Sequence, residues 1–172
     1  SFVFYKPRDI VSGDFYWIAR QKNRIAVTAA DCTGHGVPGA FMSIMGINFL
    51  NQINSPCIPL SGKVLNTMRE YVMKAMHQKG DVDDQKDGID MSFVVIDLER
   101  KHLEFSGANN PIIYFHKGEL NVIKCYRMPI GISPIGEEAF SKHIIPFNKL
   151  DSFYIFSDGY PDQFGGYKYK KL

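Results

Sequence analysis

The sequence has 172 residues and a mass of 19.5 kDa, a length that predicts one domain with its own hydrophobic core. With 45% hydrophobic and 22% charged residues, the composition is that of a globular protein rather than of a disordered chain. The formal net charge of +2 argues against a nucleic-acid-binding module, which usually carries a strong basic excess. All apolar runs are far shorter than the roughly 18–20 residues that cross a bilayer, so we expect no direct membrane contact from this segment.

The cysteines indicate the cellular location of the protein, and the two ends of the sequence indicate how much of it is present. The three cysteines are odd in number and widely separated, which excludes a disulfide framework and predicts a cytoplasmic location. The sequence starts without Met inside a predicted strand and ends in alternating Tyr and Lys residues. We therefore expect residues 1–172 to be one domain of a longer protein.

Short segments rich in aromatic and β-branched residues predict about eight strands. These segments cover residues 2–5, 15–19, 25–30, 91–98, 102–105, 112–115, 120–123 and 153–156. Turn-forming residues of hairpin length lie at 20–24, 99–101 and 116–118, which predicts antiparallel neighbours rather than parallel crossovers.

Two stretches instead show apolar residues at helical spacing, and they predict amphipathic helices over 36–54 and 61–78. The first apolar stripe consists of Val37, Ala40, Phe41, Ile44, Met45, Phe49 and Ile53, and the second of Val64, Leu65, Met68, Val72, Ala75 and Met76. The polar segment 78–88 predicts a surface loop. This order of elements predicts an α+β fold in which helices cover antiparallel sheets.

Acidic residues stand at the ends of several predicted strands. Asp14, Asp31 and Asp158 each lie next to an apolar strand and close to glycine, and such rigid carboxylates suit a hard cation such as Mg²⁺ or Mn²⁺. The alternative is that each of them only closes a turn or caps a helix. Asp87 and Asp90 flank the polar loop, where they either touch a metal or satisfy the turn, and we assign them no role.

The segment DCTGHGVPGA (31–40) joins a predicted buried strand to the first helix. Its glycines and proline predict a sterically tight backbone at the positive end of that helix, where an anion or a metal-bound phosphate would be stabilised. It is not the phosphate-binding loop of nucleotide hydrolases, because the Lys and Ser/Thr that end that motif are absent.

Five motifs taken together resemble the bacterial SpoIIE/RsbU-like serine phosphatases, a branch of the metal-dependent PPM protein phosphatases. They are DIVSGDFYW (9–17), DCTGHGVPGA (31–40), SGANNP (106–111), MPIGI (128–132) and FSDGYPDQFGG (156–166). The resemblance implies a four-layer α-β-β-α sandwich of antiparallel sheets flanked by helices. It also implies a centre of two Mn²⁺ or Mg²⁺ ions at one end of the sandwich.

The resemblance further implies a role for four residues. Asp31 corresponds to the carboxylate that bridges both ions, and the backbone carbonyl of Cys32 to the next ligand. Asp14 corresponds to the acidic residue beside them, and Asp158 to a ligand of the second ion. The family's last aspartate, in an Asp-Asp element, has no counterpart after Gly166, so we expect the C-terminal helix and strand to be missing and the metal site to be incomplete or empty.

Other polar residues near these motifs have weaker assignments. Arg8 is a candidate phosphate-binding residue, whereas Lys6 is more typical of a solvated charge at a strand edge. His35 is a candidate general acid by residue type, but its spacing from Asp31 favours a structural role. Asn109 and Asn110 either line the pocket or belong to an ordinary turn before proline.

The resemblance implies a phosphoserine/phosphothreonine phosphatase in bacterial signal transduction, whose substrate is a small phosphorylated anti-anti-sigma (STAS) protein. The nucleophile would be a water activated by two metal ions. An upstream sensor region in the same polypeptide, which could tether it to a membrane, is implied as well, and an unpaired sheet edge would favour a homodimer. Two alternatives stay open: a non-catalytic protein-binding domain of the same fold, and a hydrolase of small phosphorylated molecules.

Overall fold

The computed structural model describes residues 1–7, 10–53, 58–79, 87–133, 138–159, 162, 164–165 and 170–171. Its helices are α1 (Gly36–Ile53) and α2 (Ser61–Ala75), with a short 3-10 turn at Phe147–Lys149. Its strands are β1 (Phe15–Gln21), β2 (Arg24–Cys32), β3 (Gly88–Asp97), β4 (His102–Ala108), β5 (Ile112–His116), β6 (Glu119–Ile123), β7 (Ile130–Gly131), β8 (His143–Pro146), β9 (Ser152–Tyr154), β10 (Phe164–Gly165) and β11 (Lys170–Lys171).

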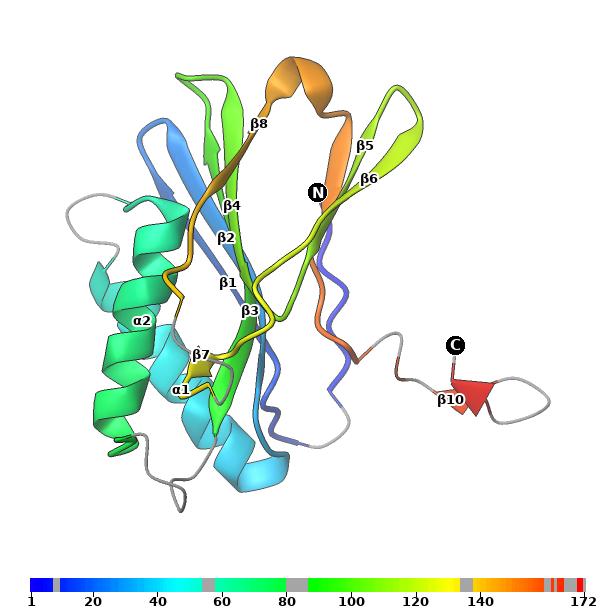
Figure 1. Cartoon of the computed structure of the whole chain (residues 1–172). Helices are drawn as coiled ribbons and strands as arrows, with labels where there is room; N and C mark the ends of the chain where they lie inside the picture. Colours follow the sequence, from blue (N-terminus) through cyan, green and yellow to red (C-terminus); the bar gives the residue numbers. More distant parts are fainter. Residues whose placement is uncertain are drawn as a thin grey trace.

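The strands form two main antiparallel sheets (Figure 1). The larger sheet has the order β1-β2-β3-β4-β8, and β7 pairs with the start of β3. The smaller sheet has the order β6-β5-β9. The short strands β10 and β11 pair with each other in a separate two-stranded sheet.

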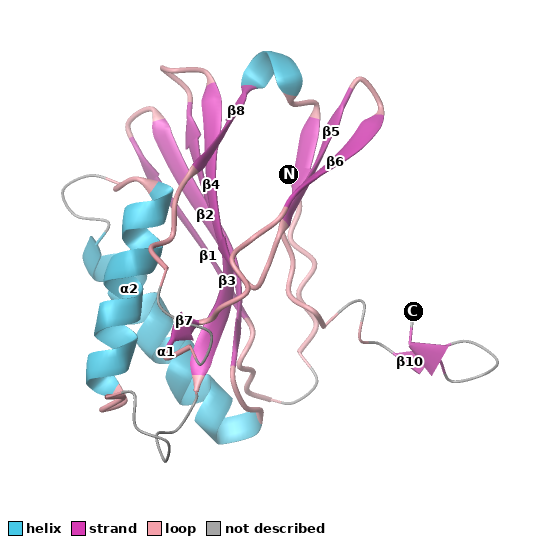
Figure 2. Cartoon of the chain, in the orientation of Figure 1, coloured by secondary structure: helices cyan, strands magenta, loops and turns pink. Residues whose placement is uncertain are grey.

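The elements pack in layers, with both helices on one face of the larger sheet and the smaller sheet on its other face (Figure 2). One core lies between the helices and the larger sheet and includes Phe49, Leu65 and Phe93. The second lies between the two sheets and includes Phe105 and Ile112. The predicted α+β class is confirmed, and the described part of the chain forms three of the four expected layers. None of the helices in this part is both long and apolar enough to cross a membrane.

The hairpin turns follow the sequence closely. Gln21 pairs with Arg24 across a two-residue turn in which Lys22 has a φ of 50°. Lys117 and Gly118 connect β5 to β6 with φ values of 52° and 78°, and two successive positive φ values are typical of the type I′ turn that fits the twist of a hairpin. The predicted antiparallel connections at these places are confirmed.

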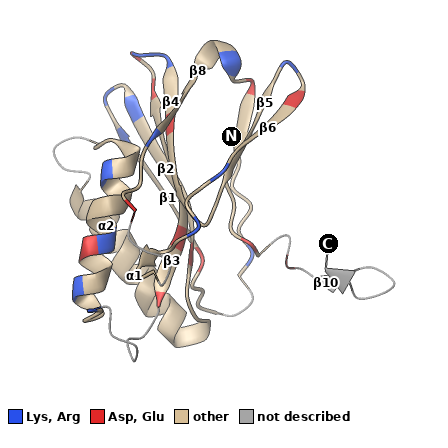
Figure 3. Cartoon of the chain, in the orientation of Figure 1, with Lys and Arg blue, Asp and Glu red and all other residues tan. Residues whose placement is uncertain are grey.

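Helix α1 lies where the sequence predicts it, but part of its predicted apolar stripe faces away from the core. Val37, Phe41 and Ile44 are exposed, whereas the buried positions include Gly39 and Gly46. Apolar residues surround the whole helix, which carries no charged residue (Figure 3), so their period does not select a face. The small residues decide it instead, because they allow the helix backbone to approach the neighbouring segments closely.

The predicted strand at residues 2–5 is wrong, since these residues belong to no strand and Phe2 and Phe4 remain 79% and 76% exposed. An apolar segment becomes a strand only where a neighbour accepts its backbone hydrogen bonds. Tyr5 is instead held by its side chain, which donates a hydrogen bond to the Asp14 carbonyl and packs edge-on against Tyr16.

The second helix and the loop after it also differ in detail. Helix α2 ends at Ala75, three residues early, because His77 adopts a left-handed φ of 54°. Residues 80–86 of the predicted loop lie outside the described residues. The start of that loop is not a free surface segment: Gln78 is buried, donates to the Asp87 carbonyl and accepts a hydrogen bond from the Ile132 N–H.

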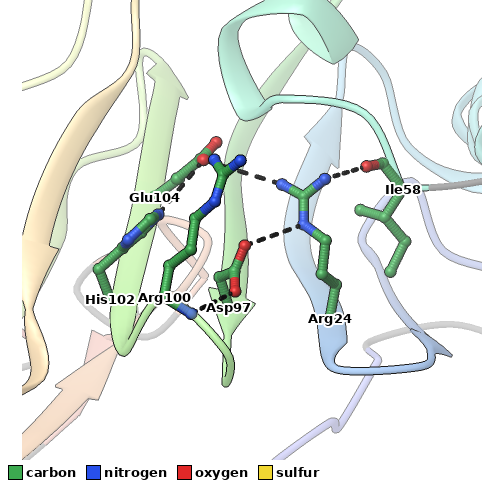
Figure 4. Close-up of polar contacts among 6 residues, drawn as sticks. All are labelled: Arg24, Ile58, Asp97, Arg100, His102 and Glu104. Carbon is green, nitrogen blue, oxygen red and sulfur yellow. Dashed lines mark hydrogen bonds and ion pairs between the residues drawn. The ribbon is translucent and has the colours of Figure 1, made fainter.

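An ionic cluster is buried at the hairpin end of the larger sheet, on the face that the helices cover (Figure 4). The Arg24 guanidinium lies 3.6 Å from Asp97 and 3.8 Å from Glu104, and it donates a hydrogen bond to the Ile58 carbonyl. His102 lies 3.4 Å from the same oxygen of Glu104. Because the Glu104 side chain is fully buried, Arg24 provides most of the compensating charge and also ties the α1–α2 connection to the sheet.

Candidate metal centre

A row of polar residues crosses four neighbouring strands at the other end of the larger sheet. Asp31 pairs directly with Asp90. Phe15 pairs with Ala30, so Asp14, one residue before β1, stands beside Asp31. On the far side, Met91 pairs with Ala108, which places Asn109 beside Asp90. The polar row is therefore Asp14, Asp31, Asp90 and Asn109.

The polar row faces the smaller sheet. Successive side chains of a strand point to opposite faces, and Ala30 and Cys32 both belong to the core under the helices. Asp31 therefore lies on the opposite face, where the two sheets meet. Asp158 comes from the smaller-sheet side of the molecule, four residues after the end of β9. The two sheets thus bring their carboxylates together at one end of the sandwich.

Hydrogen bonds hold Asp14 in place from both sides. The Ser157 hydroxyl donates to Asp14 Oδ2 at 2.9 Å, which links the segment after β9 to the start of β1. The Asp14 N–H donates to the Ser12 hydroxyl at 3.0 Å. Because Ser157 directly precedes Asp158, the same contact brings the Asp158 backbone to the polar row.

Three carboxyl groups at this end share an uncompensated negative charge. Burial, hydrogen bonding and the charges of Asp14 and Asp158 together raise the pKa of Asp31 to about 8. Neither Lys nor Arg forms an ion pair with any of the three within the described ranges. A cation would relieve this repulsion, and carboxylate oxygens are the donors that Mg²⁺ and Mn²⁺ prefer.

The donor set thus fits a divalent cation in its chemistry but does not enclose one. Across the residues that the structure describes, no three His, Cys, Asp or Glu side chains are arranged as a ready-made metal-ligand set. Any ion held by Asp14, Asp31 and Asp158 would therefore need further ligands, such as water or a backbone carbonyl.

Cys32 presents its thiol and its carbonyl to different surroundings. The side chain is buried in the core under the helices, and burial together with the nearby carboxylates raises the pKa of the thiol far above its usual value. The thiol therefore stays protonated and is a poor nucleophile. The carbonyl lies against Gly13, where an added Cβ would come within 2.9 Å of it.

The glycines of segment 31–40 allow backbone segments to pack against each other. A Cβ on Gly39 would lie 2.5 Å from the Gly34 carbonyl oxygen and 3.1 Å from the Gly13 Cα. Gly34 also has a φ of 91°, a left-handed conformation that favours glycine. The loop after Asp31, the start of α1 and the segment before Asp14 are thus locked together, which fixes the two aspartates relative to each other.

The remaining predicted residues have varied positions. Arg8 lies outside the described residues, and Lys6 and His35 are exposed. Asn110 is buried, and its side-chain Nδ2 has no hydrogen-bond partner within the described part of the chain. Asn109 donates a hydrogen bond to Asp90 Oδ1 at 2.8 Å.

Asp90, which the sequence places beside the polar loop without a clear role, belongs to this row. Burial raises its pKa, the hydrogen bond from Asn109 lowers it, and the charge of Asp158 raises it. Polar Asp90 and Ser92 alternate with apolar Ile89 and Met91 at the start of β3. This alternation is the sequence signal that could have placed Asp90 on one face of a strand.

Comparison with known families agrees with this arrangement. The family model described as Stage II sporulation protein E (SpoIIE) matches residues 21–168. The chain belongs to the SpoIIE family. The resemblance to SpoIIE/RsbU-like phosphatase domains is thereby confirmed, while no curated protein matches the chain.

Solved structures show the same fold. The SiaA-PP2C domain of Pseudomonas aeruginosa is 27% identical with a TM-score of 0.80, over 98% of this chain and 64% of that chain. The PP2C phosphatase domain of SpoIIE from Bacillus subtilis, with a fragment of its regulatory domain, is 20% identical with a TM-score of 0.62, over 80% of this chain and 38% of that one. RsbX, solved in complex with magnesium, is 14% identical with a TM-score of 0.66, over 91% and 71%. The chain thus spans less than two thirds of the first two of these proteins.

Proposed function

We propose that this SpoIIE-family chain is a metal-dependent phosphatase domain that removes phosphate from serine or threonine of a regulatory protein. The observation that carries the proposal is the convergence of Asp14, Asp31 and Asp158, which have no Lys or Arg ion-pair partner among the residues that the structure describes. Such a site binds hard divalent cations, and RsbX, which shares the fold, was solved with magnesium.

The proposed chemistry divides between the ions and the protein. Asp14, Asp31 and Asp158 would hold two Mn²⁺ or Mg²⁺ ions, which would lower the pKa of a bound water and offset the charge of the phosphoryl oxygens. Asp31, whose pKa is raised by both Asp14 and Asp158, would be the carboxylate shared by the two ions, and Ser157 would orient Asp14 through its hydrogen bond. The backbone carbonyl of Cys32, the residue after Asp31, would be a further oxygen ligand. The protonated thiol of Cys32 takes no part.

The proposal is tested with p-nitrophenyl phosphate and a phosphorylated STAS protein, with Mn²⁺ or with excess EDTA. We expect hydrolysis only with metal, and a loss of orders of magnitude in Asp31→Asn, which keeps the size of the side chain and removes its charge. If Asp31→Asn keeps more than about a tenth of the activity, a loss under ~1.4 kcal/mol, the bridging role is wrong. A nucleotide substrate separates a protein phosphatase from a hydrolase of small molecules.

A second candidate is a non-catalytic domain of the same fold that binds a regulatory protein. The observation that favours it is that the carboxylates do not form a ready-made ligand set in the described part of the chain. Such a domain would bind its partner equally well with Mn²⁺ and with EDTA and would not hydrolyse phosphate. Binding and turnover measured on the same preparation therefore distinguish the two.

The setting of the domain is proposed on the same basis. We infer that residues 1–172 form one output domain of a longer cytoplasmic signalling protein, controlled by a sensor region elsewhere in that protein. The support is the family match together with the fraction of SiaA and SpoIIE structures that the chain spans. A phosphorylated STAS-type protein is the proposed partner, and equilibrium sedimentation would test the proposed homodimer.

A further inference from the structure

Asp90 stands inside the polar row but differs from its neighbours in its contacts. It is half-buried at the start of β3 and pairs directly with Asp31. One of its carboxylate oxygens already accepts a hydrogen bond from the Asn109 amide, at 2.8 Å. Asp31, by contrast, lies near Asp14 and Asp158, and both of them raise its pKa. Asp90 thus lies one step outside the three carboxylates of the proposed centre.

Asn109 is placed to hold Asp90 in one orientation. Its backbone has a left-handed φ of 54°, and its N–H donates to the Tyr126 carbonyl at 2.8 Å. This backbone bond fixes the turn after β4, and the turn directs the Asn109 amide at Asp90 Oδ1. A simple turn would need only the backbone bond, so the side-chain contact is an additional restraint on a half-buried carboxylate.

The inference about Asp90 rests on the proposed metal centre. We propose that Asp90 is a positioning residue for that centre. It is a carboxylate behind the metal ligands, it is oriented by Asn109, and its charge tightens cation binding. A negative charge within several ångströms of a divalent ion contributes strongly at the effective dielectric of a protein surface. Partners behind the direct ligands commonly change metal affinity 10- to 100-fold. Asp90 therefore adds to the affinity without occupying a coordination position.

Calorimetric titration of the 172-residue chain with Mn²⁺ tests the inference. Asp90→Asn keeps the oxygen that accepts from Asn109 and removes only the charge, so it should weaken Mn²⁺ binding about tenfold with the number of bound ions unchanged. Asn109→Gly, which tolerates the left-handed backbone, should weaken binding about threefold. Asp151→Asn is the matched control, because Asp151 is exposed and precedes β9 at the opposite end of that strand from Asp158; it should leave binding unchanged.

Salt dependence separates a charge effect from loss of a ligand. The difference between wild type and Asp90→Asn should shrink between 0.05 and 0.5 M salt, roughly as the Debye length falls from about 14 to 4 Å. Circular dichroism and thermal melting without metal check that the variants fold, and Asp90→Ser provides a second neutral variant.

Three results would overturn the inference. The first is an Mn²⁺ affinity of Asp90→Asn within twofold of wild type, and the second is the loss of one bound ion per chain in that variant. The third is an equal loss of Mn²⁺ affinity in Asp151→Asn. A wild-type chain that binds no Mn²⁺ would reject the metal centre of the proposed function and the role of Asp90 with it. Normal wild-type binding with an unaffected Asp90→Asn variant would reject the role of Asp90 alone.

Discussion

The contact among Gly39, Gly34 and Gly13 leads to a quantitative prediction for Gly39→Ala. In most helices this change stabilises, because Ala has a helix propensity about 1 kcal/mol better than Gly. Here the new Cβ would lie 2.5 Å from the Gly34 carbonyl oxygen and 3.1 Å from the Gly13 Cα. Both are backbone atoms that move only if the loop moves, and overpacking of this kind costs about 1–3 kcal/mol or more. We expect the clash to win, with a net loss of about 1–2 kcal/mol.

Gly46→Ala is the matched control within the same helix. Gly46 is also buried, but its added Cβ would meet Phe15 Cζ at 3.0 Å and Met68 Cε at 3.2 Å. These atoms end flexible side chains, which can shift by a few tenths of an ångström. We expect Gly46→Ala to change the free energy of unfolding by no more than about 1 kcal/mol.

Urea and thermal unfolding of the metal-free chain would measure both variants. At about 2–4 °C per kcal/mol for a domain of this size, Gly39→Ala should lower Tm by about 2–8 °C. It should also weaken Mn²⁺ binding, because the displaced loop directly follows Asp31. A Gly39→Ala variant as stable as wild type, or more so, would show that helix and loop are not in backbone contact.

Three further predictions concern the carboxylates and the core. Because the pKa of Asp31 is raised to about 8, the metal-free native state keeps a proton that the unfolded chain loses near pH 4. The free energy of unfolding should therefore fall as pH rises from about 4 to 8. Urea titrations should show that Asp31→Asn removes this pH dependence. Arg24→Met leaves Asp97 and Glu104 buried without their cation, so chemical denaturation should show a loss of about 3–5 kcal/mol. Cys32→Ser should keep its Mn²⁺-dependent turnover, since the buried thiol takes no part in the proposed mechanism; lost activity with unchanged metal content would instead indicate a thiol mechanism.

The sequence predicted the three converging aspartates because each stands at the end of an apolar strand, and strand ends are visible from composition and turns. It could not show that Asp90 joins them. The residue lies beside a polar loop, and only the pairing of Asp31 with Asp90 places it in the row. Pairing depends on distant residues, so a local pattern does not contain it.

The two other differences have the same physical origin. Helix α1 is apolar on all sides, and Gly39 and Gly46 determine which face is buried. They do so because they let neighbouring segments approach closely, not because they are hydrophobic. The segment 2–5 has strand-forming residues but no neighbouring strand with which it pairs. In both cases tertiary contacts override an intrinsic preference.

The two-residue turn between β1 and β2 helps to set the geometry of the proposed metal centre, which lies at the other end of these strands. Arg24, at the turn, and Asp31 are seven positions apart, which is about 23 Å along an extended strand. An extra residue at Lys22 and Asn23 that shifted the pairing by one would turn Asp14 toward the helices and replace it beside Asp31 with Gly13 or Phe15. The length of this turn therefore determines which residue lies beside Asp31, and an insertion that shifted the pairing should abolish the proposed Mn²⁺ binding and also turn Phe15 and Trp17 out of the core.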